Sequence, residues 1–303
     1  MTDFSRLILD TFQVRKKRAQ KDAFIDLMKQ RFPALQVETG RYFGVPCKNL
    51  VLGDVDAAKV VLTAHYDTCA VLPLPNFLAP RNLLISLLYQ LVLALALLLP
   101  AFLVHFLCTA LGAEVLGNIL WLILLIAACL TPILGPPNRH TANDNTSGVI
   151  TLIEIYSRMS EEQKSKTAFV WFDHEESGLF GSAAFEKRHR KMMKQKLVVN
   201  FDCVSDGDEL LIIFGKKAKA ELPRLQAAFD RPGKLTAHFN KASTTMYPSD
   251  QINFKKSVGV AVFRRHPLVG YYISRIHTPK DTVFEEENIR QIADSAVHFV
   301  SCL

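Results

Sequence analysis

The 303-residue sequence predicts an α/β fold: a mixed, largely parallel central sheet flanked by helices and interrupted by a two-helix transmembrane hairpin. Short apolar runs that suit buried strands alternate with segments of helical periodicity, which is typical of parallel sheets. In addition, residues 82–138 contain 41 hydrophobic residues and one formally charged residue, Glu114. The rest of the chain has the composition of a soluble protein, so we expect one discontinuous domain of residues 1–81 and 139–303.

The N-terminal region is expected to be helical. Apolar side chains recur at helical spacing from Phe4 to Phe12 and from Phe24 to Met28, which predicts one or two helices over residues 3–31. Residues 60–64 then form a continuous apolar run, as in a strand buried on both faces. His65 and Asp67 follow this predicted strand directly.

Two long apolar segments make up the inserted block. Residues 83–104 and 115–134 contain no charged side chain, and each would span roughly 30 Å as a helix, the thickness of a bilayer's hydrocarbon core. Neither shows polar residues at helical spacing, so we predict a transmembrane hairpin over 82–138. We expect Pro100 to kink its first helix. The alternative is a buried helical hairpin in an enlarged soluble core.

The charges beside the hairpin predict its orientation. Arg81 and Arg139 flank its two outer ends, whereas the connecting turn carries Glu114 and no basic residue. The positive-inside rule therefore predicts an integral protein of the cytoplasmic (inner) membrane, with the soluble domain on the cytoplasmic side. The N-terminus lacks the apolar region of a cleavable signal peptide, and no CxxC pair occurs, so the six cysteines are expected to be reduced.

Further strands are predicted beyond the hairpin, and acidic residues follow them. Residues 167–172, 197–201, 210–214 and 258–263 suit strands, whereas 149–159 and 285–300 suit helices. The carboxyl ends of parallel strands meet at one edge of a sheet. We therefore expect six side chains to converge there: His65, Asp67, Asp144, Glu175, Glu176 and Asp202. Such a cluster of like charges is unfavourable unless cations neutralise it.

The residue types in this cluster indicate a metal site. Carboxylate and imidazole ligands without a thiolate pattern suit zinc in a hydrolytic site, with manganese or cobalt as alternatives. A lone His-x-Asp or a Glu-Glu pair is more often structural, but their joint appearance at strand ends makes coincidence improbable. Cys69 and Cys203 lie near candidate ligands, and we expect both to be small buried side chains rather than ligands.

These motifs and their order resemble a known family, the di-zinc exopeptidases that include bacterial leucyl aminopeptidases, glutamate carboxypeptidases and glutaminyl cyclases. The resemblance covers essentially all of the chain outside residues 82–138. The matching pieces are His65-Tyr66-Asp67, Ala142-Asn143-Asp144-Asn145-Thr146-Ser147-Gly148, Glu175-Glu176-Ser177-Gly178, Asn200-Phe201-Asp202, Ser249-Asp250 and His277-Thr278-Pro279-Lys280-Asp281.

The resemblance implies a role for each site residue. Asp144 would bridge two zinc ions, Glu176 and His277 would complete one site, and His65 and Asp202 the other. Asp67 would accept the spare N–H of His65 and fix its orientation. Glu175 would be the general base that takes a proton from the water shared by the metals, which then attacks as hydroxide. The chain would thus be a membrane-anchored metallopeptidase, an aminopeptidase in preference to a carboxypeptidase.

Other functions stay open at this point. A glutaminyl-cyclase-like acyltransferase would work with a single zinc, and a non-enzymatic scaffold would need no metal. Ile276 stands where many family members have a tyrosine that stabilises the oxyanion, and Tyr247, Tyr271 or Tyr272 could replace it. Asp250 is a weak candidate for binding the substrate's ammonium group.

The expected partners are a peptide substrate and the lipid bilayer. The hairpin joins two metal motifs, so it should hold the site near the membrane, and the substrate could be a membrane-associated peptide. The basic runs 15–18 and 187–191 suit either a solvated surface or an anionic membrane. They lack interleaved aromatic residues, so no nucleic-acid partner is expected.

Overall fold

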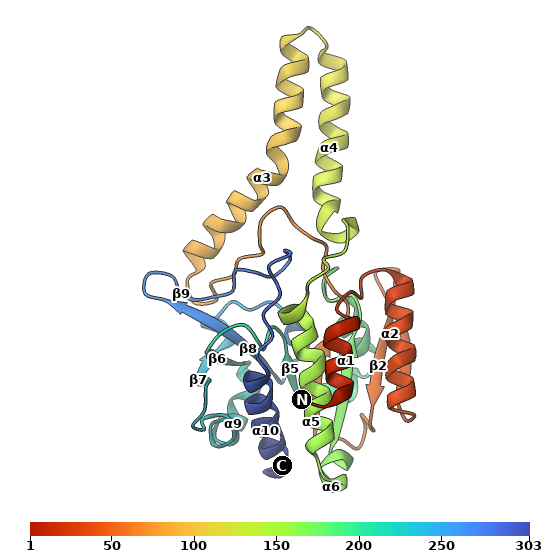
Figure 1. Ribbon diagram of the computed structural model, residues 1–303, viewed down its shortest axis with the longest axis vertical. Helices are drawn as coiled ribbons and strands as arrows, with labels where there is room; N and C mark the ends of the chain where they lie inside the picture. Colours follow the sequence, from red (N-terminus) through yellow and green to blue (C-terminus); the bar gives the residue numbers. More distant parts are fainter.

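A computed structural model describes all 303 residues and contains a nine-stranded mixed sheet flanked by helices (Figure 1). The strand order is β1-β2-β4-β3-β5-β8-β6-β7, with β9 paired to β8. The four central strands, β4, β3, β5 and β8, run parallel, and antiparallel pairs flank them. The strands are β1 Gln36–Tyr42, β2 Val45–Leu52, β3 Val60–His65, β4 Thr167–Phe172, β5 Leu197–Phe201, β6 Glu209–Phe214, β7 Thr236–Lys241, β8 Ser257–His266 and β9 Gly270–Tyr272. The predicted fold class is confirmed.

Helices cover both faces of the sheet because the central strands are apolar on both faces. On β3, Val60 and Leu62 belong to one core cluster, whereas Val61 belongs to another. The larger cluster includes side chains from α1 Asp3–Thr11, α2 Arg18–Arg31, α5 Gly148–Arg158, α9 Leu222–Phe229 and α10 Glu286–Ser301. The smaller one includes side chains from α7 Phe180–Arg188 and α8 Arg190–Met193, and the short α6 spans Glu161–Ser165.

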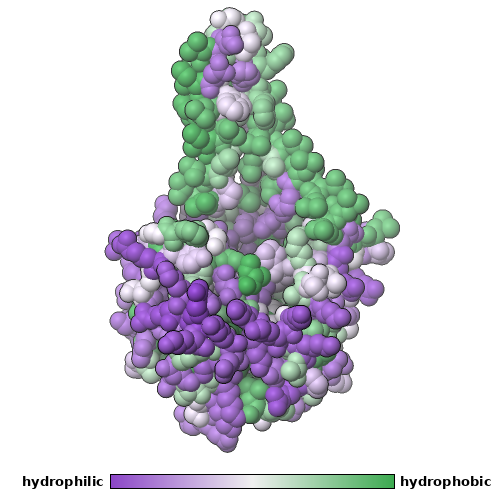
Figure 2. All heavy atoms as spheres, turned by 180° about the vertical axis from the view of Figure 1, so that it is seen from behind, coloured by the Kyte–Doolittle hydropathy of each residue, from purple (hydrophilic) through white to green (hydrophobic).

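The apolar block forms two long helices that project from the domain (Figure 1). Helix α3 spans Leu83–Ala110 and α4 spans Glu114–Leu134. The side chain of Asn82 caps α3 by accepting a hydrogen bond from the N–H of Ile85 at 3.2 Å. Figure 2 shows an apolar surface over most of the hairpin. Both helices are long and apolar enough to cross a membrane and are mostly exposed, so they do not form the buried hairpin of the alternative prediction.

Helix α3 differs from its prediction in two respects. It continues six residues past the expected end at residue 104, and its first turns carry a polar stripe of Ser86, Tyr89 and Gln90. The prediction that polar residues are absent at helical spacing was therefore wrong for these turns. Figure 1 shows a bend in α3, as expected from Pro100, whose ring clashes with the carbonyl four residues earlier.

Candidate metal centre

The candidate site lies at the carboxyl ends of three parallel strands. His65 is the last residue of β3, Glu175 and Glu176 follow β4, and Asp202 follows β5. Their convergence results from the parallel register, which pairs His65 with Phe172 and Thr63 with Asn200. Asp144 comes from the short η1 segment, Ala142–Ser147, and His277 from the loop after β9. The structure thus brings every predicted metal ligand to one rim.

Asp144 lies between two groups of ligands. Its Oδ1 is 3.4 Å from Nε2 of His65, which in turn lies 3.5 Å from Oδ1 of Asp202. Its Oδ2 is 3.2 Å from Nε2 of His277, which also lies 3.2 Å from Oε2 of Glu176. One carboxylate therefore serves both groups, as a bridging ligand must.

Three buried polar atoms at this site have no hydrogen-bond partner: Nε2 of His65, Oδ1 of Asp202 and Oε1 of Glu176. An unpartnered buried polar atom is costly, so such atoms need a ligand. The atoms lie on both sides of Asp144, and nitrogen and oxygen donors of this kind suit zinc. The residues therefore fit a metal at each of the two groups.

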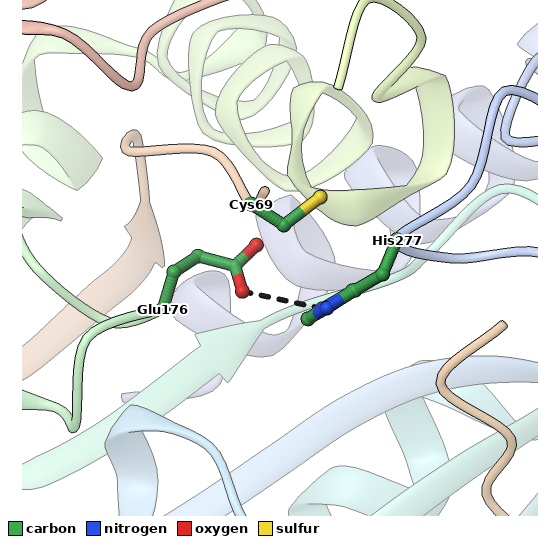
Figure 3. Close-up of side chains that lie close together, drawn as sticks. All are labelled: Cys69, Glu176 and His277. Carbon is green, nitrogen blue, oxygen red and sulfur yellow. Dashed lines mark ion pairs between the residues drawn. The ribbon is translucent and has the colours of Figure 1, made fainter. Parts of the chain in front are cut away.

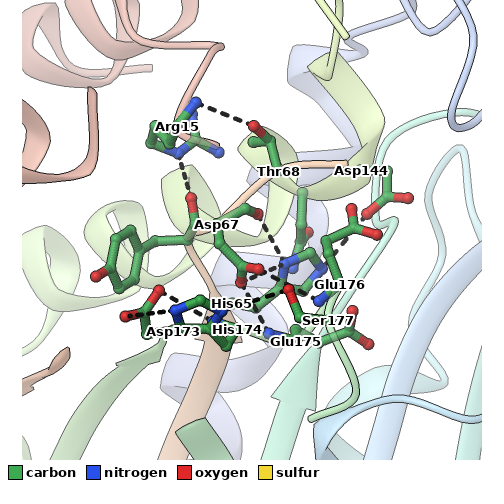
Figure 4. Close-up of polar contacts among 12 residues, drawn as sticks. Arg15, His65, Asp67, Thr68, Asp144, Asp173, His174, Glu175, Glu176 and Ser177 are labelled. Atoms are coloured by element: carbon green, nitrogen blue, oxygen red, sulfur yellow. Dashed lines mark hydrogen bonds and ion pairs between the residues drawn. The ribbon is translucent and has the colours of Figure 1, made fainter. Parts of the chain in front are cut away.

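Asp67 contacts the site differently from the prediction. Nδ1 of His65 lies 3.0 Å from the backbone carbonyl of Asp67 and 3.7 Å from its carboxylate. The carboxylate instead accepts hydrogen bonds from the backbone N–H groups of Glu175 and Glu176, at 2.9 and 3.3 Å (Figure 4). Asp67 thus positions both glutamates as well as the histidine, because its short side chain reaches the loop after β4.

Two supporting residues were missed in the sequence. The Asp281 carboxylate accepts hydrogen bonds from the N–H groups of Asn143 and Asp144, at 2.9 and 3.0 Å, and burial beside Asp144 raises its pKa to about 8. Arg15, expected on a solvated surface or facing anionic lipid, is fully buried. Its guanidinium donates to the Tyr66 carbonyl and to the Thr146 hydroxyl. Its backbone N–H donates to the Thr68 hydroxyl at 3.0 Å (Figure 4). The position of Asp281, four residues after His277, could have indicated its place near the site. Nothing in the basic run 15–18 indicates that Arg15 is buried.

Glu175 faces a cavity of about 450 Å³ together with Asp144, Glu176, Asp202 and His277. Burial raises the pKa of Glu175 well above its ordinary value, although the nearby His65 acts in the opposite direction. Perturbed carboxyl groups of this kind cluster at functional sites. The lining of the cavity also includes the apolar side chains of Leu78, Leu179, Met246, Ile273 and Ile276 and the uncharged polar side chains of Asn76, Gln90 and Tyr247.

Of the predicted substitutes for a catalytic tyrosine, Tyr247 lines the cavity, whereas Tyr271 and Tyr272 do not. The Tyr247 hydroxyl donates to the backbone carbonyl of Asp202 at 2.9 Å, Tyr271 packs against His238 and Tyr272 stacks on Phe77. Asp250 is fully buried and does not line the cavity, so it is not placed to bind an ammonium group there.

Cys69 lies beside one of the two ligand groups. Its Sγ and the ligand atoms of Glu176 and His277 all lie within 4.8 Å of one another (Figure 3). Cys69 and Cys203 are buried and free, as expected.

The fold and the candidate ligands are typical of metal-dependent hydrolases, and comparison with known proteins gives the family. The model described as Peptidase family M28 matches residues 127–300, more than half of the chain. The chain therefore belongs to peptidase family M28. The match begins after His65 and Asp67, so the place of these two residues in the site comes from the geometry alone.

Curated and solved relatives agree with this family. A "Probable leucine aminopeptidase" of Arthroderma otae is 25% identical over 150 residues, which are 47% of this chain and 42% of that protein. The chain thus spans less than half the length of that relative. The Legionella pneumophila LapA aminopeptidase superposes with a TM-score of 0.58 at 14% identity, over 99% of this chain and 69% of that one. The Porphyromonas gingivalis glutaminyl cyclase superposes with a TM-score of 0.59 at 13% identity, over 98% and 95%. These solved structures show the shared fold.

Proposed function

We propose that the protein is a membrane-anchored di-zinc exopeptidase that removes residues from the amino terminus of peptides. The observation that carries this proposal is the position of Asp144, with one carboxylate oxygen toward His65 and the other toward His277. Asp202 would complete the first site and Glu176 the second. Manganese or cobalt would suit the same ligands.

Bound zinc ions would supply Lewis-acid chemistry, because they polarise a carbonyl group and lower the pKa of water toward neutrality. The Glu175 carboxylate would take the proton from the attacking water and pass it to the leaving amine as the peptide C–N bond breaks. Asp67 would hold the Glu175 backbone in place through its 2.9 Å hydrogen bond. The apolar side chains that line the cavity would exclude water from the cleft.

The charge of the cavity favours the amino terminus over the carboxyl terminus. No lysine or arginine lines it, so a substrate's terminal carboxylate would meet acidic side chains without a cation to pair with. A terminal ammonium group is compatible with the same surroundings. The names of the Arthroderma otae and Legionella pneumophila relatives support the same choice.

The proposed location is the cytoplasmic membrane, with α3 and α4 as the anchor and the remaining domain in the cytoplasm. Arg81 and Arg139 at the outer ends of the hairpin support this orientation. The hairpin leaves and re-enters the domain between Asp67 and Asp144, so the site would face the membrane and act on peptides at its surface.

A glutaminyl-cyclase-like acyl transfer is the second candidate, because the Porphyromonas gingivalis cyclase is covered over 95% of its chain. Such an enzyme would use one zinc. The unpartnered Nε2 of His65 and Oδ1 of Asp202 argue for a second metal instead.

A peptide-library digest by the full chain in lipid nanodiscs, read by mass spectrometry, tests the proposal. We expect peptides to lose single residues from the amino terminus, and the enzyme to contain about two zinc-type ions per chain. Shortening from the carboxyl terminus, or pyroglutamate formation with one ion bound, would replace the proposal by one of its alternatives.

A further inference from the structure

The first two turns of α3 are tied to the domain by their polar stripe. The Ser86 hydroxyl donates to the Ala79 carbonyl at 2.9 Å and accepts from the Ala79 N–H at 3.0 Å. The Tyr89 hydroxyl donates to the Pro75 carbonyl at 2.9 Å. The Gln90 amide nitrogen donates to Oδ1 of Asn76 at 3.3 Å and to the Phe77 carbonyl at 3.4 Å, so its amide oxygen is the atom left to accept from a ligand. Side chains at this spacing share one face of a helix, so this face of α3 lies against segment 75–79.

The opposite face of these turns is apolar and open. Leu84, Leu87, Leu88 and Leu91 are each more than half exposed. The start of α3 therefore has a polar side toward the domain and an apolar side that suits lipid. Such a division places these turns at the membrane interface.

Segment 75–79 is in turn hydrogen-bonded to the loop that carries His277. The N–H of Leu78 donates to the Ile273 carbonyl and the N–H of Ile273 donates back, at 3.1 and 2.9 Å. The N–H of Asn76 donates to the Ile276 carbonyl at 3.1 Å. Helix α3 is thus hydrogen-bonded to segment 75–79, and this segment is hydrogen-bonded to the His277 loop. These three parts together form one wall of the domain.

That wall reaches the candidate catalytic cavity. Gln90, Asn76 and Leu78 line the same cavity as Glu175 and His277. Gln90 comes from the second turn of α3, and its amide is a neutral group that both donates and accepts hydrogen bonds. A peptide bound in the cavity would present backbone N–H and C=O groups, which pair with amides of this kind.

We propose that Gln90 is a specificity-determining residue that contacts the bound peptide, and that α3 is thereby a wall of the substrate site as well as an anchor. The inference rests on the proposed peptidase function. The substrate class that follows is a peptide bound at the membrane interface, with its first residues between α3 and the acidic group around Glu175.

The test compares variants of the full chain in lipid nanodiscs. In Gln90→Leu, which removes the amide and keeps the volume similar, we expect KM to rise roughly tenfold with little change in kcat. Tyr89→Phe is the matched control. It removes one hydrogen bond between α3 and segment 75–79, but neither Tyr89 nor its partner Pro75 lines the cavity. Its KM should stay within about twofold of wild type.

A second variant gives a gain rather than a loss. Gln90→Glu adds a carboxylate to the cavity. The ratio of kcat/KM for peptides with Lys in their first two positions to kcat/KM for matched peptides with Glu should therefore rise roughly fivefold over the wild-type ratio. Unchanged KM in Gln90→Leu together with an unchanged Lys-to-Glu ratio in Gln90→Glu would overturn the inference while leaving the peptidase function intact. If Tyr89→Phe raised KM as much as Gln90→Leu, the rise would come from a weaker attachment of α3 to the domain. That result would overturn the inference about Gln90 as well. Failure of the wild-type chain to cleave any peptide would overturn the proposed function itself.

Discussion

At the scale of single residues, the chain places neighbouring glutamates in different surroundings. Glu176 lies 3.2 Å from His277 and has an unpartnered carboxylate oxygen, whereas Glu175 faces the cavity near Asp202 and Asp250. Both glutamates lie in the turn after β4, where the backbone changes direction and adjacent side chains can point to different sides. The pair therefore supplies one candidate ligand and one candidate base.

Substitutions should separate these two roles. We expect Glu175→Gln to keep both metals and to lose turnover by about 10²–10⁴-fold, the usual contribution of a general base. Glu176→Ala should lose metal as well as turnover, because it removes a ligand. Metal analysis beside steady-state rates makes the comparison, and a Glu175→Gln enzyme of near-normal rate would refute the base assignment.

The buried Arg15 carries a second prediction at this scale. Burial lowers its pKa to about 10, although the nearby Asp67 acts in the opposite direction, so it stays charged at neutral pH. Arg15→Met would leave the Tyr66 carbonyl and Thr146 without their donor and should lower the free energy of unfolding by about 3 kcal/mol. Arg18→Met, at an exposed residue of the same basic run, should change it by less than about 0.5 kcal/mol. Urea unfolding in detergent compares them, and equal losses would contradict the structural role of Arg15.

At the scale of elements, the buried Glu154 joins the first helix to the centre of the fold. Its carboxylate accepts hydrogen bonds from the Ser5 hydroxyl at 2.6 Å and the Thr2 N–H at 2.7 Å, and from Arg158 at 3.0 Å. Burial alone would raise the pKa of Glu154, but these hydrogen bonds lower it below the usual value. Helix α1 is thus attached to α5 by a group whose charge matters.

This attachment predicts a pH dependence. A carboxyl whose pKa is lowered by folding stabilises the protein above its ordinary pKa of 4.5, and this stabilisation is lost as the pH falls through the lower, folded value. Glu154→Gln should therefore cost about 1–2 kcal/mol at pH 7, and the difference from wild type should shrink below pH 4.5. Urea unfolding at several pH values measures it. Glu161→Gln is the matched control, since Glu161 is exposed and its ion pair with Lys164 contributes little.

The elements also show how far sequence alone can predict this fold. Strands β3, β4 and β5 were predicted within a residue, because strands buried on both faces read as unbroken apolar runs. Strands β1, β2, β7 and β9 were not predicted. The side chains of β1 and β7 are largely half-exposed and polar, β9 has only three residues, and Pro46, Lys48 and Asn49 interrupt the apolar residues of β2. The polar stripe of α3 was missed for a related reason: Ser86, Tyr89 and Gln90 are few within a very apolar block, and the segment that they contact is irregular.

At the scale of the whole molecule, the convergence of the candidate ligands could be predicted, because these residues follow strands or sit in motifs whose order is typical of the family. The hydrogen bonds that hold these residues and their neighbours in position could not be predicted. Whether Asp67 holds a histidine or a backbone amide depends on distances of a few ångströms between loops that are far apart in sequence. The burial of Arg15 depends likewise on residues up to 131 positions away.

The orientation in the membrane is a prediction for the whole chain. Leu111 in the turn between α3 and α4 is 83% exposed, and Cys302 near the carboxyl terminus is exposed. In a Cys108→Ser background, a cysteine from Leu111→Cys should react with a membrane-impermeant maleimide in intact cells. Cys302 should react only after the membrane is permeabilised. The reverse labelling pattern would place the domain on the other side of the membrane.

The hydrogen bonds from α3 through segment 75–79 to Ile273 and Ile276 have a mechanical consequence. Helix α3 has 28 residues, about 42 Å at the usual rise, so only part of it would lie within the hydrocarbon core of a bilayer, and its first two turns would lie at the interface. A helix that is too long for its bilayer tilts, and a thinner bilayer tilts it further. Because the base of α3 is hydrogen-bonded through segment 75–79 to the His277 loop, a tilt of the helix would displace that loop. In the proposed anchored state, the thickness of the surrounding membrane would therefore be a physical variable on which the shape of the candidate active site depends.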